Sequence, residues 1–195
     1  IRRFIRNPES CSQTGNTVLI DLIYGWGNEA WSAQDEYLAA CIHHALSSSG
    51  PTLECGSGLS TILIGVIANK RGQSHWALEH SPEWAMRVQR SLTRYALDSA
   101  VILCANPLRD YGDFDWYDPP RESMPGVFGL VICDGPPGST KGGRYGLVPI
   151  MKEYLKPGCV ILLDDANREQ ELAIAARWKT ELGASLEICG SSRRH

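Results

Sequence analysis

Residues 51–61 combine an acid, a Gly-x-Gly turn and small polar side chains directly after a short apolar run. Glu54 precedes the turn, and its glycines are Gly56 and Gly58. Glycines at the carboxyl end of a parallel strand let a small ligand approach the bare backbone. A dinucleotide places its pyrophosphate at the positive amino terminus of the following helix. Here Glu54 stands beside the loop and Thr61 replaces the third glycine of the dinucleotide pattern. The turn therefore favours a ligand with a cationic head and no phosphate.

Acids also stand where three other expected strands end. They are Glu79, Asp134 and Asp165. The carboxyl ends of parallel strands meet at one edge of the sheet, and ligands bind beyond that edge at the switch point beside the first strand. We therefore expect these acids to lie near Glu54 and to line one site.

Short apolar runs alternate with helical patterns from Pro51 onward. The expected strands are 52–55, 74–79, 100–104, 127–133, 159–163 and 185–189, and the expected helices are 60–69, 81–96, 143–155 and 167–182. A polar, aromatic loop is expected over 106–125. Ser81 caps its helix, with Pro82 in the first turn. This alternation predicts the α/β class, with a Rossmann-like, doubly wound, mostly parallel sheet covered on both faces.

The first fifty residues are less regular, and we expect them to be helical. Trp26, Trp31 and the run 34–46 are placed to close over the site. The expected organisation is one globular unit, in which residues 1–50 form an N-terminal helical cap or substrate lid and residues 51–195 form the ligand-binding domain.

Composition excludes several broad classes. A length of 195 residues fits one domain with a sizeable core. A net charge of -3 gives no electrostatic case for general nucleic-acid binding. No run approaches the roughly 18 apolar residues of a membrane span. The seven cysteines are odd in number and lack a Cys-x-x-Cys pair, which favours free thiols and a cytoplasmic location.

In their order and spacing, these segments resemble the class I S-adenosylmethionine (SAM)-dependent methyltransferases, and the likeness runs from Leu53 to Cys189. Glu-Cys-Gly-Ser-Gly-Leu-Ser-Thr is similar to the first motif of that family. Glu79 stands where the family has its ribose-binding acid. Val-Ile-Cys-Asp-Gly-Pro-Pro-Gly, which contains Asp134, is similar to the fourth motif. Lys-Pro-Gly-Cys-Val-Ile-Leu-Leu-Asp-Asp-Ala-Asn-Arg is similar to the fifth-strand segment of small-molecule O-methyltransferases.

The resemblance implies SAM as cofactor and methyl transfer to a small-molecule acceptor, with oxygen as the receiving atom. A sulfonium methyl is already activated, so transfer mostly needs positioning and a deprotonated acceptor. Asp134 and Asp165 are the catalytic candidates on the acceptor side. The cofactor-binding residues that the resemblance implies are Glu54, Gly56, Ser57, Gly58, Ser60, Thr61, Glu79, His80, Ser81, Asn106, Leu108, Asp134 and Gly135.

A magnesium ion is left open by the sequence. Catechol-type O-methyltransferases hold Mg²⁺ with an acid after the fourth strand and an Asp-Asn pair after the fifth. Here Ala166 separates Asp165 from Asn167, which departs from that pattern. Oxygen ligands of this kind suit Mg²⁺, whereas Asp165 as the N-cap of a helix beginning near Asn167 needs no metal.

Two rival functions fit part of the same pattern. One is a nicotinamide-dependent oxidoreductase, against which the missing third glycine argues, and the other is a non-catalytic SAM-binding protein. Nucleic-acid N-methyltransferases carry Asp-Pro-Pro-Tyr or Asn-Pro-Pro-Tyr at the fourth strand, where this chain has Asp-Gly-Pro-Pro-Gly, so a nucleic-acid substrate is not expected. After the Pro-Pro-Gly turn stand Lys141, Arg144 and Tyr145, which either reach an acidic or phenolic acceptor or belong to a mobile glycine-rich loop with solvated charges. On the early helix, His43 and His44 are alternatives for a general base or for ordinary surface histidines. A homo-oligomer is compatible with the sequence.

Overall fold

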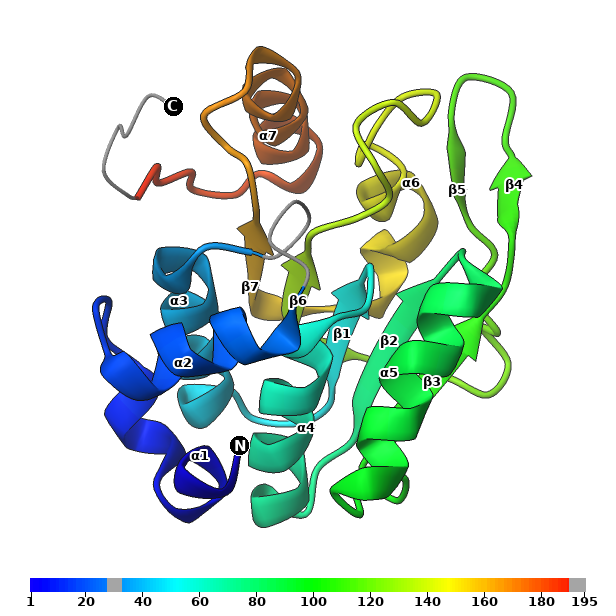
Figure 1. The fold of residues 1–195 in the computed structure, drawn as a ribbon. Coiled ribbons are helices and arrows are strands. Elements are labelled where there is room, and N and C mark those ends of the chain that lie inside the picture. Colours follow the sequence, from blue (N-terminus) through cyan, green and yellow to red (C-terminus); the bar gives the residue numbers. More distant parts are fainter. Residues whose placement is uncertain (28–32, 190–195) are drawn as a thin grey trace.

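A five-stranded parallel sheet forms the centre of the molecule (Figure 1). The structure is a computed structural model, and it describes residues 1–27 and 33–189. The strand order is β3-β2-β1-β6-β7, and every neighbouring pair is parallel. The strands of this sheet are β1 (Thr52–Cys55), β2 (His75–Glu79), β3 (Val101–Ala105), β6 (Phe128–Cys133) and β7 (Leu155–Leu163). The sequence therefore predicted the α/β, doubly wound class correctly. Trp31, expected in the lid, lies outside the described residues.

The strands are apolar on both sides because the sheet lies between two cores. In β6, Leu130 and Ile132 belong to one core, whereas Val131 and Cys133 belong to the other. Successive side chains of a strand point to opposite faces. A strand buried on both faces therefore reads as a continuous hydrophobic run, as in parallel sheets generally.

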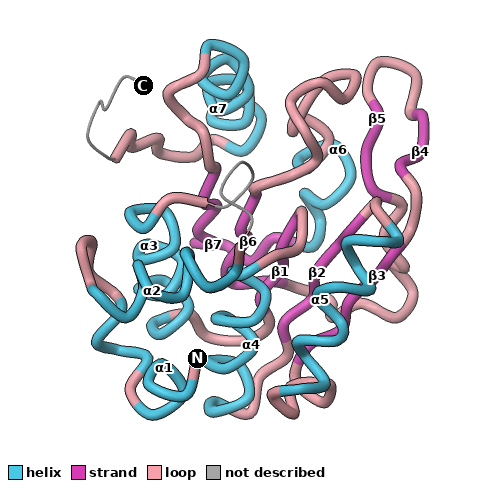
Figure 2. Tube along the Cα trace, in the orientation of Figure 1, coloured by secondary structure: helices cyan, strands magenta, loops and turns pink. Residues whose placement is uncertain are grey.

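Five helices and a short 3₁₀ turn build the core on the first face (Figures 1 and 2). They are α1 (Arg2–Arg6), the 3₁₀ turn η1 (Pro8–Cys11), α2 (Thr17–Trp26), α3 (Asp35–Ser47), α4 (Leu59–Arg71) and α5 (Pro82–Arg94). Helix α4 is buried from Leu59 to Ala68, so it forms the centre of this layer. Helix α5 begins as the sequence indicates, because Ser81 Oγ accepts a hydrogen bond from the Trp84 N–H at 3.2 Å.

The second face is covered by α6 (Leu147–Met151), the 3₁₀ turn η2 (Lys152–Tyr154), α7 (Glu169–Leu182) and a β-hairpin. The hairpin pairs β4 (Leu108–Asp110) with β5 (Asp115–Tyr117) in antiparallel register. Its side chains Trp116 and Tyr117 are buried in the second core. Among the described residues, no helix is both long and apolar enough to cross a membrane.

Three sequence-based expectations were wrong in detail. The expected loop 106–125 contains the β4–β5 hairpin. The expected helix 143–155 is helical only as α6 and η2, because Leu155 already pairs with Phe128 as the start of β7. The expected strand 185–189 is absent from the described chain: it pairs with no strand, and Leu186 and Ile188 are exposed.

The helical character expected for the first fifty residues is confirmed. These helices do not form a core of their own, since Phe4 and Leu38 share one apolar cluster with Ile62 of α4. Helix α3 also reaches the sheet, where Tyr37 Oη donates a hydrogen bond to the Leu162 carbonyl at 3.1 Å. A boundary at residue 50 and a lid function for residues 1–50 stay predictions.

The close packing of α4 on β3 yields a first testable prediction. A Cβ on Gly65 would lie 2.5 Å from Val101 Cγ2, so we expect Gly65→Val to reduce the free energy of unfolding by about 1–3 kcal/mol. Val101→Ala removes the opposing methyl groups, and the two substitutions combined should therefore cost less than their sum. Urea unfolding of the four proteins measures this coupling. Strict additivity would contradict the assigned contact.

Candidate functional site

The glycine turn after β1 and the loop after β6 meet backbone to backbone at the carboxyl edge of the sheet. Gly56 has φ +86°, and a Cβ there would lie 3.0 Å from Gly135 N. A Cβ on Gly135 would lie 3.0 Å from Gly56 Cα and 2.5 Å from Tyr117 Oη. The Gly135 N–H donates to the Cys55 carbonyl at 2.7 Å. Only glycine permits this approach, which brings the first and fourth motifs into one site.

Glu54 lies beneath the glycine turn and is 0% exposed. Its Oε2 accepts a hydrogen bond from Thr61 Oγ1 at 2.6 Å and lies 3.0 Å from His75 Nε2. Thr61 Oγ1 in turn accepts the Gly58 N–H at 2.8 Å, and His75 Nδ1 lies 2.8 Å from Thr52 Oγ1. Glu54 thus fixes the turn through Thr61. Its Oε1 is buried and without a hydrogen-bond partner in the described chain.

Glu79, at the end of β2, joins the glycine turn to the start of α5. Its Oε2 accepts the Ser57 N–H at 3.0 Å and the Ser57 hydroxyl at 2.8 Å. Its Oε1 accepts the N–H groups of His80 and Ser81, both at 2.8 Å. The side chain is almost fully buried, so a sugar hydroxyl reaches this carboxylate only where the Ser57 hydroxyl gives way.

An arginine between two tryptophans connects α2 with the glycine turn. The Arg87 guanidinium lies 5.1 Å from the Trp26 ring centre and 4.7 Å from that of Trp84, and it donates to the Trp26 carbonyl. The Trp84 indole N–H donates to the Ser57 carbonyl. Such cation–π contacts stabilise by about 0.5–2 kcal/mol each, depending on desolvation. The end of α2 is therefore held over the site by residues of α5.

A cavity of ≈ 30 Å³ lies at this junction. Trp26 and Leu38 border it from the N-terminal helices, and Asp134 borders it from the end of β6. Its floor is the start of α4, from Ser57 to Ser60. Thus the structure brings together the turn residues Ser57, Gly58 and Ser60 with the catalytic candidate Asp134, as the sequence predicts.

Asn106 and Leu108 follow β3 at the base of the hairpin. Asn106 is exposed and its side-chain amide donates to the Asp118 carbonyl at 3.2 Å, whereas Leu108 packs against the second core. Their contact with an adenine ring stays a prediction. Tyr117, on the hairpin, is buried beside Gly135, and its hydroxyl has no hydrogen-bond partner among the described residues. Burial raises the pKa of this phenol well above its ordinary value.

Asp134, Asp164 and Asp165 gather where β6 and β7 end. Each offers a carboxylate oxygen within 4.8 Å of the others. Burial, and secondly the charge of Asp164, raises the pKa of Asp134 well above its ordinary value, although Arg144 acts in the opposite direction. Asp165 has φ +57° and does not cap α7, whose N-cap is Arg168; the N-cap alternative is therefore wrong.

Arg144 binds this acid cluster on its buried side. One guanidinium nitrogen lies 2.9 Å from Asp165 Oδ2, 3.3 Å from Asp134 Oδ1 and 2.8 Å from the Asp134 carbonyl oxygen. The other donates to the Asp164 carbonyl at 2.6 Å. Arg144 is 3% exposed, so it cannot also contact an acceptor as the sequence suggested. A Mg²⁺ ion fits this arrangement poorly, because a guanidinium already neutralises the carboxylates that would bind it.

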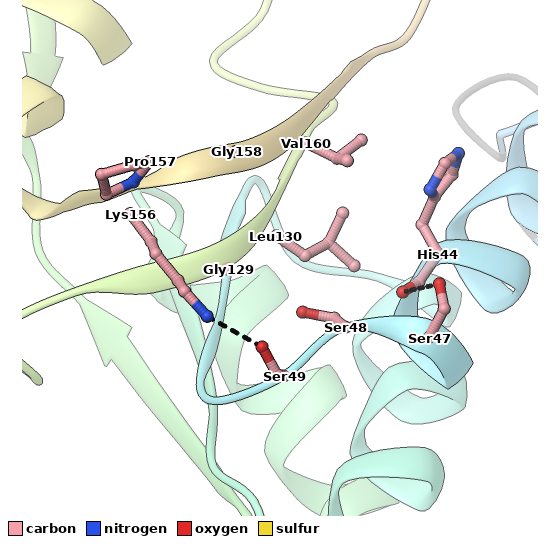
Figure 3. A pocket seen from close by; sticks show the side chains of 10 residues that line it. All are labelled: His44, Ser47, Ser48, Ser49, Gly129, Leu130, Lys156, Pro157, Gly158 and Val160. Carbon is pink, nitrogen blue, oxygen red and sulfur yellow. Dashed lines mark hydrogen bonds between the residues drawn. The ribbon is translucent and has the colours of Figure 1, made fainter.

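A larger cavity, ≈ 190 Å³, lies at the opposite end of the sheet (Figure 3). His44 and Ser47–Ser49 line it from α3 and the residues after it, and Gly129 and Lys156 line it from the amino ends of β6 and β7. His44 therefore faces away from the site, and His43 is exposed beside it on the same helix. Neither histidine is placed to serve as a general base at the carboxyl edge.

Comparisons with known proteins bear on the fold. No protein-family model and no curated protein sequence matches this chain. Solved structures do match. The SAH-bound Podospora anserina methyltransferase PaMTH1 superposes with a TM-score of 0.59 over 91% of this chain and 84% of its own, at 16% identity. The Streptomyces achromogenes O-methyltransferase TomG, involved in tomaymycin synthesis and solved with SAM, gives 0.57 over 88% and 80%, at 14% identity.

A third match is the Aquifex aeolicus tRNA (m1A58) methyltransferase TrmI, with a TM-score of 0.54 over 84% of this chain and 59% of its own, at 17% identity. The chain has the class I SAM-dependent methyltransferase fold. Glu54, Glu79 and Asp134, which the sequence placed at the ends of the first, second and fourth strands, stand toward the carboxyl ends of β1, β2 and β6, which are neighbouring strands. Of these three acids, only Asp134 borders the cavity at the glycine turn.

Sequence reasoning missed several residues that organise the methyltransferase fold here. His75 supports Glu54, and Arg87 and Trp84 hold the end of α2. Alternation along β2 was the available signal for His75, since a histidine facing the same side as Ala77 in a buried strand requires a polar partner. No local pattern identifies Arg87, because both of its aromatic partners depend on the tertiary fold.

The buried Glu54–His75 pair yields a second prediction. We expect His75→Phe to reduce the free energy of unfolding by about 3–5 kcal/mol, because Glu54 then loses a buried partner. The double variant Glu54→Leu/His75→Phe should recover part of that loss, since it removes the buried carboxylate that lost its partner. The recovery is incomplete because the hydroxyls of Thr61 and Thr52 then lack their partners. Thr52→Val, which removes one hydrogen bond, should cost only about 1 kcal/mol. Urea unfolding distinguishes these cases, and a double variant as unstable as His75→Phe would contradict the pairing.

Proposed function

We propose that this chain transfers a methyl group from SAM to a small-molecule acceptor, with an oxygen as the receiving atom. The carrying observation is the carboxylate of Asp134, which borders the same cavity as the glycine turn and the start of α4. The shared fold with structures solved with SAM or SAH supports the same assignment. Bound SAM would supply an activated methyl group, and the residues described here would bind, orient and desolvate the reactants.

On the cofactor side, the glycine turn offers backbone groups to the amino-acid end of SAM. Glu79 accepts the ribose hydroxyls in place of the Ser57 hydroxyl, and its remaining N–H bonds from His80 and Ser81 keep it oriented. Glu54 acts through Thr61, which holds the Gly58 N–H. A pocket for a ligand as large as SAM needs a volume of about 300 Å³ or more, whereas the cavity at the glycine turn has ≈ 30 Å³. The proposal therefore requires Trp26 and the end of α2 to move when SAM binds.

On the acceptor side, Asp134 is the general base and Asp165 orients the acceptor. Their side chains are 28% and 27% exposed, whereas Arg144 beneath them is 3% exposed. The carboxylates are thus the groups that an incoming hydroxyl meets, and a general base in reach of that proton accelerates transfer. TomG, an O-methyltransferase, is consistent with an oxygen acceptor, whereas TrmI acts on tRNA. The net charge of -3 favours a small molecule over tRNA. A cytoplasmic location and a homo-oligomer belong to the same proposal.

Calorimetric titration with SAM, SAH and NADH tests the cofactor assignment. We expect SAM and SAH to bind with dissociation constants on the order of micromolar and NADH not to bind. Binding of NADH alone would favour an oxidoreductase instead, and no binding of either sulfur ligand would overturn the proposal.

Asp134→Asn separates catalysis from cofactor binding and gives a third prediction. With radiolabelled SAM and a panel of phenols and catechols, we expect the variant to transfer methyl groups about 100-fold or more slowly, while its affinity for SAM changes little. Asp110→Asn is the matched control, because Asp110 lies exposed on the hairpin, where its carboxylate accepts the Gly112 N–H and pairs with the exposed Lys141. Equal transfer rates in Asp134→Asn and the wild type would remove Asp134 from the mechanism. Binding without transfer to any acceptor would favour a non-catalytic SAM-binding protein.

The raised pKa of Asp134 gives a fourth prediction. A base must be ionised to accept a proton, so activity should fall as the pH drops through this raised pKa. The acid limb of kcat/KM should therefore lie above the ordinary aspartate value of about 3.9. Rates measured between about pH 4 and pH 9 locate the limb. The residual activity of Asp134→Asn should not show this acid limb. An unchanged limb in that variant would mean that another group titrates there.

A further inference from the structure

We propose that Arg144 takes the part of a divalent cation in the acid cluster at the ends of β6 and β7, so that this site binds no metal. The cluster consists of Asp134, Asp164 and Asp165, whose carboxylate oxygens approach within 4.8 Å of one another. Carboxylates this close repel one another, and a positive charge between them relieves that repulsion. The metal-binding part of this inference stands alone, and its consequence for catalysis rests on the proposed function.

The terminal nitrogens of Arg144 make the contacts that this role requires, and its buried Nε–H has no partner among the described residues. The guanidinium meets two carboxylates, Asp134 and Asp165, and two backbone carbonyls, those of Asp134 and Asp164. These acceptors come from the ends of two adjacent parallel strands, so one side chain ties both strand ends together. The planar, fixed geometry of a guanidinium suits several oxygen acceptors at once.

A second arginine strengthens the same conclusion. Arg168 Nη1 lies 2.9 Å from Asp165 Oδ2, the oxygen that Arg144 also binds at 2.9 Å. A Mg²⁺ ion needs oxygen ligands at about 2.0–2.1 Å in near-octahedral geometry. At Asp165 Oδ2 it would stand against two guanidinium groups, and their positive charge would repel it. Binding there requires Arg144 to leave a position in which it is 3% exposed.

Arg144 is therefore a positioning residue. It lies below the carboxylates and holds them, while their other faces remain partly exposed toward the acceptor side. A metal in that position would contact the acceptor oxygen directly as a Lewis acid. A buried guanidinium does not, so deprotonation of the acceptor falls to the carboxylates. The inferred reaction is independent of divalent cations.

Binding of Mn²⁺, followed by electron paramagnetic resonance and calorimetry, tests the inference without any methyl acceptor. We expect no stoichiometric Mn²⁺ binding by the wild type and at least a tenfold gain in affinity in Arg144→Met, which removes the charge but keeps an unbranched side chain. Arg144→Lys, which restores a positive charge, should show no gain. Adding Asp134→Asn to Arg144→Met should abolish the new site.

Three outcomes would overturn the inference. One is Mn²⁺ binding by the wild type that Asp134→Asn abolishes, which decides the question even where Arg144→Met does not fold. Another is a folded Arg144→Met, verified by its circular dichroism melt, that binds no Mn²⁺. The third is methyl transfer by the wild type that stops in EDTA and returns with Mg²⁺. A protein that binds neither SAM nor Mn²⁺ would contradict the proposed function and leave the arginine assignment intact, so the two failures are distinguishable.

Discussion

A carboxyl group buried in the middle of the sheet constrains the whole carboxyl edge of this molecule. Glu54 is 0% exposed and lies under α4, where an unpaired carboxylate would cost several kcal/mol. Thr61 and His75 supply the compensating contacts. Because Thr61 also holds the Gly58 N–H, the energetic requirement of one buried group fixes the glycine turn, the first turn of α4 and the alignment of β1 with β2.

The two halves of the site are coupled through backbone contacts. Gly56 and Gly135 approach so closely that neither position tolerates a Cβ, and the Gly135 N–H binds the Cys55 carbonyl. Movement of the glycine turn is therefore transmitted to the loop that carries Asp134. Arg144 continues this connection from Asp134 to the end of β7. In consequence the glycine turn, the loop that carries Asp134 and the end of β7 form one connected edge, and the proposed function leaves adaptation to a ligand to Trp26 and the end of α2.

The sequence predicted those parts of the fold that local patterns determine. Runs of apolar residues identified β1, β2 and β6, and Ser81 with Pro82 located the start of α5. It failed where pairing across the chain decides the structure. The β4–β5 hairpin lies in a polar, aromatic segment without strong alternation, and β7 begins early because Leu155 finds Phe128 as a partner. Residues 185–189 have strand-like composition but no neighbouring strand in the described chain, and composition alone does not create one.

The same limit applies to the roles of the candidate site residues. From the sequence, Glu54 beside a glycine turn suggests a ligand with a cationic head, and Arg144 suggests contact with an acceptor. Burial changes both interpretations, because each side chain is enclosed and bound to internal partners, Glu54 to Thr61 and Arg144 to Asp165. In the proposed function, Glu54 acts on the ligand indirectly, by fixing the glycine turn through Thr61. Arg144 provides positive charge where three acids converge. Buried polar groups therefore set the geometry of this edge of the sheet, and in the proposed function the exposed residues that meet the ligand act on that geometry.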